Sequence, residues 1–227
     1  MRLYERLATA EPGSDHAVIA ARLVAECSGD EALLRRWLAG RDVPSGLAGD
    51  TDFRWLLLGN LARRGWLRPG ELDEAEEADP TFGGRLAALQ ARASQPTAAA
   101  KAWAWKQVVE ESSRSNHQLV ALLQGFWATP DLDLVRPYVP RFFTEVPRLS
   151  AWLGDDALAR VVRFGFPRVV ERATLRLAEE ALANAALSPA TRRNIVDGAS
   201  SLGEAVRSRE RYAPRREAVG GSSSGSW

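Results

Sequence analysis

The stretch that decides the fold is DTDFRWLLLGNLARRG, residues 50–65. Apolar side chains recur in it at positions i, i+3, i+4 and i+8, namely Phe53, Leu56, Leu57 and Leu61. This spacing places them on one face of an α-helix. Asp50 suits the N-cap and Gly65 suits the end of such a helix. Because Trp55 and Leu58 form an adjacent apolar stripe, we expect this helix to be buried on two sides.

The same combination of period and caps recurs outward along the chain. Ser14 and Asp30 suit the N-caps of two preceding helices, and in the first of these Ile19, Leu23 and Cys27 share one face. Further helices are expected to start after Thr81, Pro96, the SRSN turn, Pro130, Asp155 and Ser188. No stretch alternates apolar and polar residues with a period of two, as a half-buried strand would. The sequence therefore predicts an all-α fold of stacked antiparallel helical hairpins, a HEAT-like α-solenoid bowl.

Composition narrows the class of protein. The chain has 227 residues, of which 45% are hydrophobic and 26% are charged, as in ordinary globular proteins. Its 30 basic and 29 acidic residues give a net charge of +1, which argues against a dedicated nucleic-acid-binding protein. A single cysteine, Cys27, cannot form an internal disulfide. Neither a signal peptide nor an apolar run long enough to span a membrane is present, so we expect a cytoplasmic protein.

Motifs that carry chemistry are missing from the sequence. The two histidines, His16 and His117, lie far apart, and there is no H-E-x-x-H, P-loop or G-x-S-x-G motif. The sequence therefore assigns no catalytic and no metal-binding residue to this chain. Arg54 is the one candidate peptide-binding residue. The alternative for Arg54 is a helix–helix contact in which it pairs with an acid.

Four segments carry a resemblance to a known family. They are RLYERLATAEPGSD (2–15), VPSGLAGDTDFRWLLLGNLARRG (43–65), ADPTFGGRLAALQARASQPTAAAKAWAWKQVV (78–109) and PYVPRFF (137–143). In this order they resemble the C-terminal helical domain of aminopeptidase N-type zinc aminopeptidases, above all actinobacterial members. That domain is shared with the antigen-trimming aminopeptidases of the endoplasmic reticulum. We expect it to cover residues 1–212, followed by a flexible tail at 213–227 that is first basic and then rich in Gly and Ser.

The resemblance implies a role without catalysis. In that family the zinc ligands and the glutamate base belong to an upstream thermolysin-like domain, whose H-E-x-x-H and G-x-M-E-N motifs are absent here. The C-terminal domain is a helical bowl over the catalytic cleft that limits which peptides reach the metal. The implied partners are the catalytic domain and peptide substrates, without a membrane. The resemblance implies no cofactor in this chain and zinc in the missing catalytic domain.

Two other functions fit parts of the sequence. The stacked-hairpin pattern also suits a free-standing helical-repeat protein that binds a protein or peptide in its groove. The basic stretch 207–217 and the many arginines suit a nucleic-acid-binding protein, whose affinity would fall steeply with salt. A catalytic domain encoded upstream in the same reading frame would count against the first of these.

Overall fold

The computed structural model describes residues 11, 13–183, 185 and 187–212, so the expected tail at 213–227 lies outside the described residues. This part of the chain is helical and contains no β-strand, which confirms the predicted all-α class. Its α-helices are α2 (Asp15–Cys27), α3 (Glu31–Leu38), α4 (Thr51–Arg63), α5 (Glu71–Ala78), α6 (Phe82–Ser94), α7 (Ala98–Val109), α8 (Asn116–Trp127), α9 (Val139–Glu145), α10 (Asp155–Gly165), α11 (Arg172–Leu182) and α12 (Pro189–Tyr212). Three short 3-10 helices, η1 (Leu132–Leu134), η2 (Arg136–Tyr138) and η3 (Val146–Ala151), flank α9 in the proline-rich segment.

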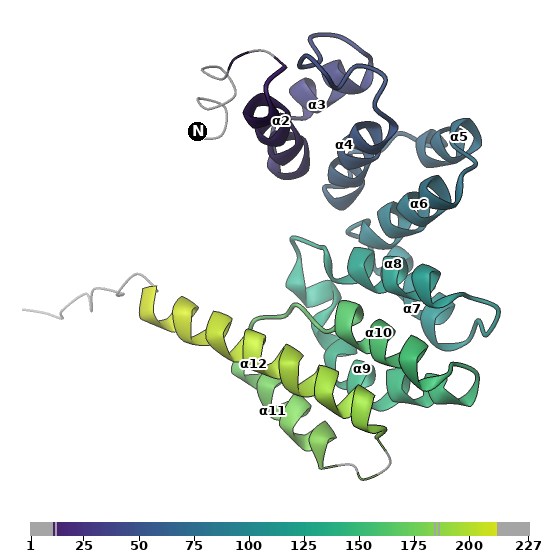
Figure 1. The fold of residues 1–227 in the computed structure, drawn as a ribbon, viewed down its shortest axis with the longest axis vertical. Helices are drawn as coiled ribbons and strands as arrows, with labels where there is room; N and C mark the ends of the chain where they lie inside the picture. Colours follow the sequence, from purple (N-terminus) through teal and green to yellow (C-terminus); the bar gives the residue numbers. More distant parts are fainter. Residues whose placement is uncertain (1–10, 12, 184, 186, 213–227) are drawn as a thin grey trace, which may run out of the picture.

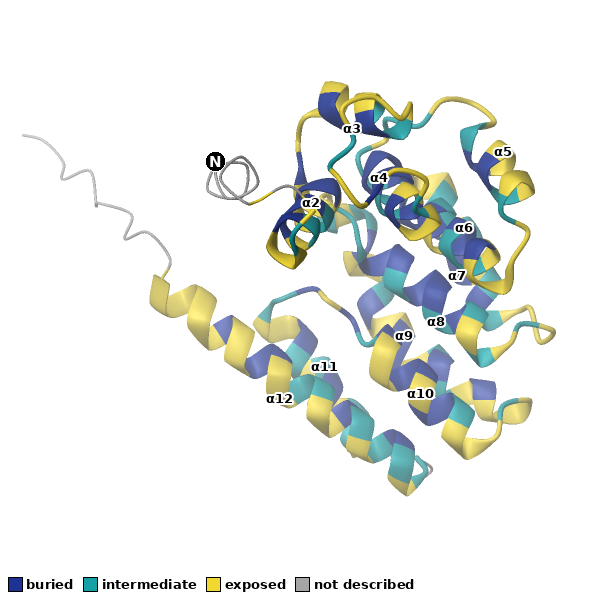
Figure 2. Ribbon diagram, turned by 45° about the horizontal axis from the view of Figure 1, so that its top comes forward, coloured by how far each residue is buried: buried dark blue, intermediate teal, exposed yellow. Residues whose placement is uncertain are grey.

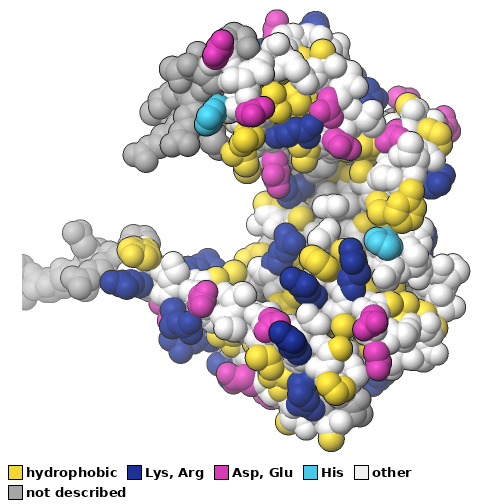
Figure 3. All heavy atoms as spheres, viewed as in Figure 1, with side chains coloured by type: hydrophobic (Ala, Val, Ile, Leu, Met, Phe, Trp, Pro, Cys, Tyr) yellow, Lys and Arg dark blue, Asp and Glu magenta, His cyan; other side chains and the backbone are white. Residues whose placement is uncertain are grey.

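The helices form two layers. The even-numbered helices α2, α4, α6, α8, α10 and α12 make one row, in which each packs on the next. The odd-numbered helices lie behind this row, and α3, α5, α7 and α11 each pack on the even helix that follows them in sequence. The row curves, so that α2 and α12 lie on the same side of the molecule with an opening between them (Figure 1). In the space-filling view this opening is a hollow that side chains do not fill (Figure 3).

Side-chain caps start the helices where the sequence predicts. The side chains of these residues each accept a hydrogen bond from the backbone N–H three residues later: Ser14, Asp30, Asp50, Thr81, Thr97 and Ser188. Each bond satisfies an amide that has no partner inside its helix. The helix boundaries are therefore encoded locally, by residues next to the boundaries themselves.

The apolar stripe of Ile19, Leu23 and Cys27 is not the buried face of α2. Ile19 and Leu23 are 58% and 40% exposed, and Cys27 is also exposed. The face that packs on α4 is instead made of small residues, among them Ala21 and Val24. Small side chains allow the two helix backbones to approach closely, and this choice between two apolar stripes depends on the neighbouring helix.

The core changes character along the row. In the first half, buried residues form two small clusters, one centred on Leu34 and Leu57 and the other on Trp55 and Ala88. In the second half they form one large cluster that is rich in aromatic rings. Figure 2 shows the buried residues where helices meet and exposed residues over the last turns of α12.

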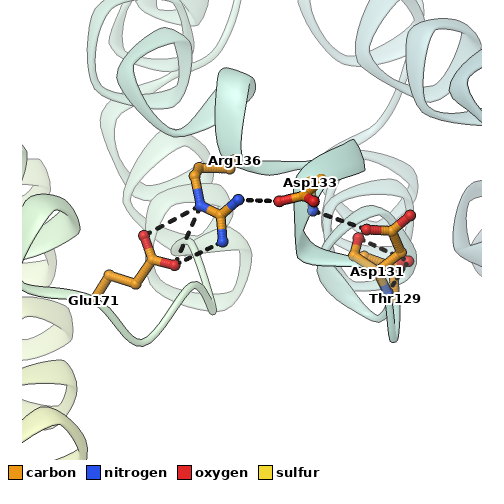
Figure 4. A network of polar contacts seen from close by, with 5 residues as sticks. All are labelled: Thr129, Asp131, Asp133, Arg136 and Glu171. Atoms are coloured by element: carbon orange, nitrogen blue, oxygen red, sulfur yellow. Dashed lines mark hydrogen bonds and ion pairs between the residues drawn. The ribbon is translucent and has the colours of Figure 1, made fainter.

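A polar network anchors the segment between α8 and α9. The Arg136 guanidinium donates to both carboxylate oxygens of Glu171, from Nε at 3.2 and 3.3 Å and from Nη2 at 2.9 Å, and also to Asp133 (Figure 4). Thr129 and Asp131 hold the preceding turn. These bonds raise the pKa of Arg136, with Glu171 as the main cause. The network fixes η2 beside the residue that precedes α11.

Candidate ligand-binding groove between helices α4 and α6

A groove with a volume of about 440 Å³ runs between α4 and α6 and ends at the last turn of α8. Its wall on α4 includes Asp52, Trp55, Leu56, Gly59 and Arg63. The remaining lining residues are Glu26, Thr51, Asn60, Asp79, Thr81, Gly83, Gly84, Ala87, Gln90, Ala91, Ser94, Gly125 and Ala128. Small residues dominate the α6 side, which is why space remains between two packed helices.

Helix α4 is fixed by polar bonds at both ends. At its start the Asp50 carboxylate accepts from the Phe53 amide at 2.8 Å and pairs with Arg22 of α2. Near its end the buried Asn60 amide donates to the carbonyl oxygens of Ala25 and Ser28, both at 2.9 Å. These carbonyls belong to the last turn of α2 and its C-cap and have no partner inside the helix. The α4 wall of the groove is therefore held rigidly against α2.

An indole–carboxylate pair joins α4 to the start of α6. Trp55 Nε1 donates to Asp79 Oδ2 at 2.8 Å, and Thr81 Oγ1 donates to Asp79 Oδ1 at 2.8 Å. Thr81 Oγ1 in turn accepts from the Gly84 amide as the N-cap of α6. The Trp55 bond is the main cause that lowers the pKa of Asp79, and the Thr81 bond adds to it. Asp79 is thus held as a carboxylate at the edge of the groove.

Two glycines set how closely the walls approach. A Cβ on Gly84 would lie 2.2 Å from the Asp79 carbonyl oxygen, and a Cβ on Gly125 would lie 2.1 Å from the Gln90 carbonyl oxygen. Gly59 differs, since a Cβ there would meet nothing within 4 Å. The first two glycines are required by packing, whereas Gly59 leaves the groove open.

The groove carries a negative charge excess. Glu26, Asp52 and Asp79 contribute carboxylates, and Arg63 contributes the one guanidinium of the lining. The Arg63 guanidinium is used internally, because it donates to the Glu26 carbonyl oxygen and to Asn60. The side chains of Glu26 and Asp52 have no ion-pair partner within the described part of the chain. They are available to donors from a ligand.

Arg54 points away from this groove. It is exposed on α4 and lines a smaller pocket of about 370 Å³ between α3, the following loop and α4. It has no ion-pair partner among the residues the structure describes, so the expected pairing with an acid is absent there. Trp55, its neighbour, is buried and is a packing and pairing residue as predicted. The peptide-binding role of Arg54 stays a prediction.

The other residues singled out in the sequence have structural surroundings. His16 is exposed in the first turn of α2, and the ring of His117 packs edge-on against Phe82 at 5.7 Å. In the described ranges, no group of three or more His, Cys, Asp or Glu side chains could hold a metal ion. None of the helices described is both long and apolar enough to cross a lipid bilayer. Sequence reasoning missed Asp79 and the groove glycines, although the unusual Gly83-Gly84 pair in the first turn of a helix was a signal.

The fold and the groove define a stacked-helix domain with a ligand-sized recess. The chain matches the family described as "ERAP1-like C-terminal domain" over residues 2–202, and it belongs to that family. Among individual proteins it is similar to "Aminopeptidase N" of Streptomyces lividans, with 33% identity over 215 residues. The alignment covers 93% of this chain and 25% of that relative, so the chain spans about a quarter of the relative's length. The family expected from the four sequence segments is thus confirmed.

Proposed function

We propose that this chain is the non-catalytic C-terminal domain of a zinc metallo-aminopeptidase of the aminopeptidase N type. In this role it covers the catalytic cleft and limits which peptides reach it. The α4–α6 groove is the observation that carries the proposal. Its two walls come from 50–63 and 78–94, two of the segments that carry the family resemblance. Its Glu26 and Asp52 side chains have no ion-pair partner among the described residues.

The groove suits an extended peptide chemically. A peptide advances about 3.3 Å per residue when extended, so a recess between two helices accommodates a few residues. The carboxylates of Glu26 and Asp52 can accept hydrogen bonds from backbone amides or cationic side chains of a peptide. Trp55 and Leu56 add apolar surface beside them. These contacts would bind a segment of the peptide that lies several residues away from the peptide's amino terminus.

The exposed face of α2 supports attachment to a further protein part. Ile19 and Leu23 lie one turn apart on the first helix of the even row, and both are large, apolar and exposed. Since the chain spans about a quarter of its relative, the catalytic part of the longer chain is the occupant we assign to this face. Replacing both residues with Asp should weaken association with that part.

Zinc enters this proposal only through the separate catalytic part. The described residues offer no donor set that fits a zinc ion, and no step is assigned to a metal in this chain. The partners are therefore the catalytic part and its peptide substrates. A cytoplasmic location remains an expectation from the sequence.

The proposal is tested by hydrolysis assays with zinc present. The chain is assayed alone and then mixed with the catalytic part of a related aminopeptidase that lacks its C-terminal domain. Substrates are an aminoacyl anilide and a peptide of about ten residues, which is long enough to extend beyond a catalytic cleft. We expect no hydrolysis by the chain alone. In the mixture, we expect a changed rate for the peptide and little change for the anilide.

Two glycine variants locate the effect. Gly59→Trp places a large ring in the groove, whereas Gly154→Trp places the same ring in open space at the start of α10. Gly59→Trp should reverse the change in peptide hydrolysis by at least about threefold, and Gly154→Trp should not. Zinc-dependent hydrolysis by the chain alone, or equal effects of both variants, would contradict the proposal.

The second candidate is a free-standing helical-repeat protein that binds a protein or peptide. The same groove favours it, because binding there requires no catalytic part. If the mixture behaves as the catalytic part alone while peptides still bind the chain at the groove, this candidate replaces the first.

A further inference from the structure

Helix α10 carries an exposed aromatic ring between two arginines. The guanidinium carbon of Arg160 lies 5.4 Å from the centre of the Phe164 ring, and that of Arg163 lies 5.2 Å from it. Phe164 is 38% exposed, which is unusual for a large apolar side chain on a packed helix. We call these three residues the α10 patch.

The two arginines of the α10 patch lack the ion pairs that some other arginines form. Examples of paired arginines are Arg92, with Asp73 and Glu76, and Arg172, with Glu210. Arg160 and Arg163 have no ion-pair partner among the residues described. Within the described residues, their guanidinium groups are therefore available to an acidic ligand.

Helix α10 lies in the second half of the even-numbered row, between α8 and α12. Helix α10 contacts α8 on one side, α12 on another and η3 of the second layer on a third. Figure 3 shows that Lys and Arg side chains gather over the half of the molecule that contains α10 and α12.

Charge is divided between the two halves of the chain. Residues 11–95 contain 14 acidic and 10 basic side chains, a net charge of −4. Residues 96–212 contain 13 acidic and 16 basic side chains, a net charge of +3. A ligand drawn to the α10 patch therefore meets a positive field, whereas the groove in the other half is negative.

We propose that the α10 patch binds an acidic segment of a peptide that also carries an apolar side chain. Guanidinium groups pair with carboxylates through two parallel hydrogen bonds, and the exposed ring provides an apolar platform between them. Arginine and aromatic residues are also the side chains that most often dominate binding surfaces. The identification of this peptide with an aminopeptidase substrate rests on the proposed function, whereas the binding itself does not.

Binding is tested with the whole chain by fluorescence anisotropy. The probe is a fluorescein-labelled peptide of alternating Glu and Leu, compared with peptides in which Gln or Lys replaces Glu. We expect the Glu peptide to bind more tightly than the Gln peptide and the Lys peptide to bind least. Its affinity should fall as salt rises, because the paired groups are exposed.

Variants separate the α10 patch from the net charge. Arg160→Glu with Arg163→Glu should weaken binding of the Glu peptide by at least about tenfold, and Phe164→Ala by about threefold. The control is Arg85→Glu with Arg176→Glu, which changes the net charge equally at exposed arginines of α6 and α11. It should change the affinity by less than about twofold. Circular dichroism confirms that each variant is folded.

Three results would overturn the proposal. They are no binding of the Glu peptide, equal binding of the Gln peptide, or an equal loss of affinity in the control variant. Each is independent of the hydrolysis assays. If the α10 patch binds as expected and the mixture shows no altered hydrolysis, the proposed function fails while this inference stands.

Discussion

The two halves of the even-numbered row solve the same packing problem differently. On the α6 side of the space between α4 and α6 the lining residues are mostly glycine and alanine, and a groove of about 440 Å³ remains. Around α8, α9 and α10 the corresponding space is filled by rings that pack edge to face. These rings are Trp105, Phe126, Trp127, Tyr138, Phe142, Phe143 and Phe166. The space between helices is thus filled by side chains in the second half, whereas a groove remains open in the first half.

This difference separates stability from binding. The aromatic cluster is continuous, so removing one ring weakens the packing of several helices at once. The first half is divided into two small clusters on either side of α4, and its polar bonds hold the helix ends instead. We expect most of the stability to come from the second half and most of the ligand contacts of the groove to come from the first.

The largest effect is expected from removing a ring of the aromatic cluster. Trp105 is 2% exposed, contacts three other rings and donates to Glu145 at 2.8 Å. Trp105→Ala should lower the free energy of unfolding by about 3–5 kcal/mol. Trp55→Ala should cost less, about 3 kcal/mol, because the space it leaves opens into the groove and water can enter it. Urea denaturation followed by circular dichroism measures both, and a larger loss for Trp55→Ala would reverse the comparison.

The next effect concerns the contact at which the two halves meet. A Cβ on Gly125 of α8 would lie 2.1 Å from the backbone oxygen of Gln90 on α6, so Gly125→Ala must push two helices apart. We expect a loss of about 3 kcal/mol in the free energy of unfolding. The control is Gly203→Ala of α12, where the nearest atom is Nη1 at the far end of the exposed Arg207 side chain, 3.3 Å away. If Gly203→Ala costs as much, backbone contact is not what joins the halves.

A buried lysine provides a pH-dependent test at the same junction. Lys101 is fully buried and donates to the carbonyl oxygens of Ala93 and Phe126, at the C-terminal ends of α6 and α8. Burial lowers the pKa of Lys101 from 10.5 to about 7. Between these values the unfolded chain binds more protons than the folded one. The contribution of this group to stability should therefore rise with pH, by up to about 1.4 kcal/mol per pH unit.

Comparison with Lys101→Met isolates this contribution. Other titrating groups cancel in the difference between the free energies of unfolding of the wild-type chain and the variant. That difference should be larger at about pH 9.5 than at about pH 7, because only the wild-type chain gains stability from Lys101 over this range. Parallel pH profiles for the two proteins would show that Lys101 keeps its proton in the folded state.

The smallest effect is expected in the groove itself. Gly59 lies inside α4 and a Cβ there meets nothing within 4 Å, so Gly59→Ala adds helix propensity without a clash. We expect a gain of about 0.5–1 kcal/mol in the free energy of unfolding, read from the urea midpoint. A decrease in the free energy of unfolding would instead mean that the groove closes in solution, so that both halves are filled by their own side chains.

The features that could be predicted from the sequence are those that neighbouring residues determine. Asp50 and Thr81 cap helices through bonds to amides three residues away, so each cap is visible in a short stretch. The wide apolar arc of 50–65 likewise identifies a helix buried on two sides. The apolar stripe of α2 does not by itself identify its buried face, because the choice of Ala21 over Ile19 depends on how closely α4 approaches.

The groove could not be predicted for the same reason. Trp55 and Asp79 are separated by 24 residues, and their pairing depends on where the loop and α5 return the chain. Gly59, Gly84 and Gly125 look alike in the sequence. In the structure, backbone atoms lie close to Gly84 and Gly125, whereas Gly59 faces open space. Local patterns do not contain the distance between helices, and the groove is defined by that distance.

The even-numbered row also has a mechanical consequence. Each helix in it packs chiefly on its neighbours in the row, so the arms that end in α2 and α12 are joined through the contacts of α6 with α7 and α8. In such an arrangement, a small rotation of one arm about these contacts produces a larger displacement of α2 relative to α12. Cys27, the sole cysteine, is exposed on α2 and would take a spin label there. A second label at Tyr212→Cys on α12 would allow the distance between α2 and α12 to be measured with and without peptide.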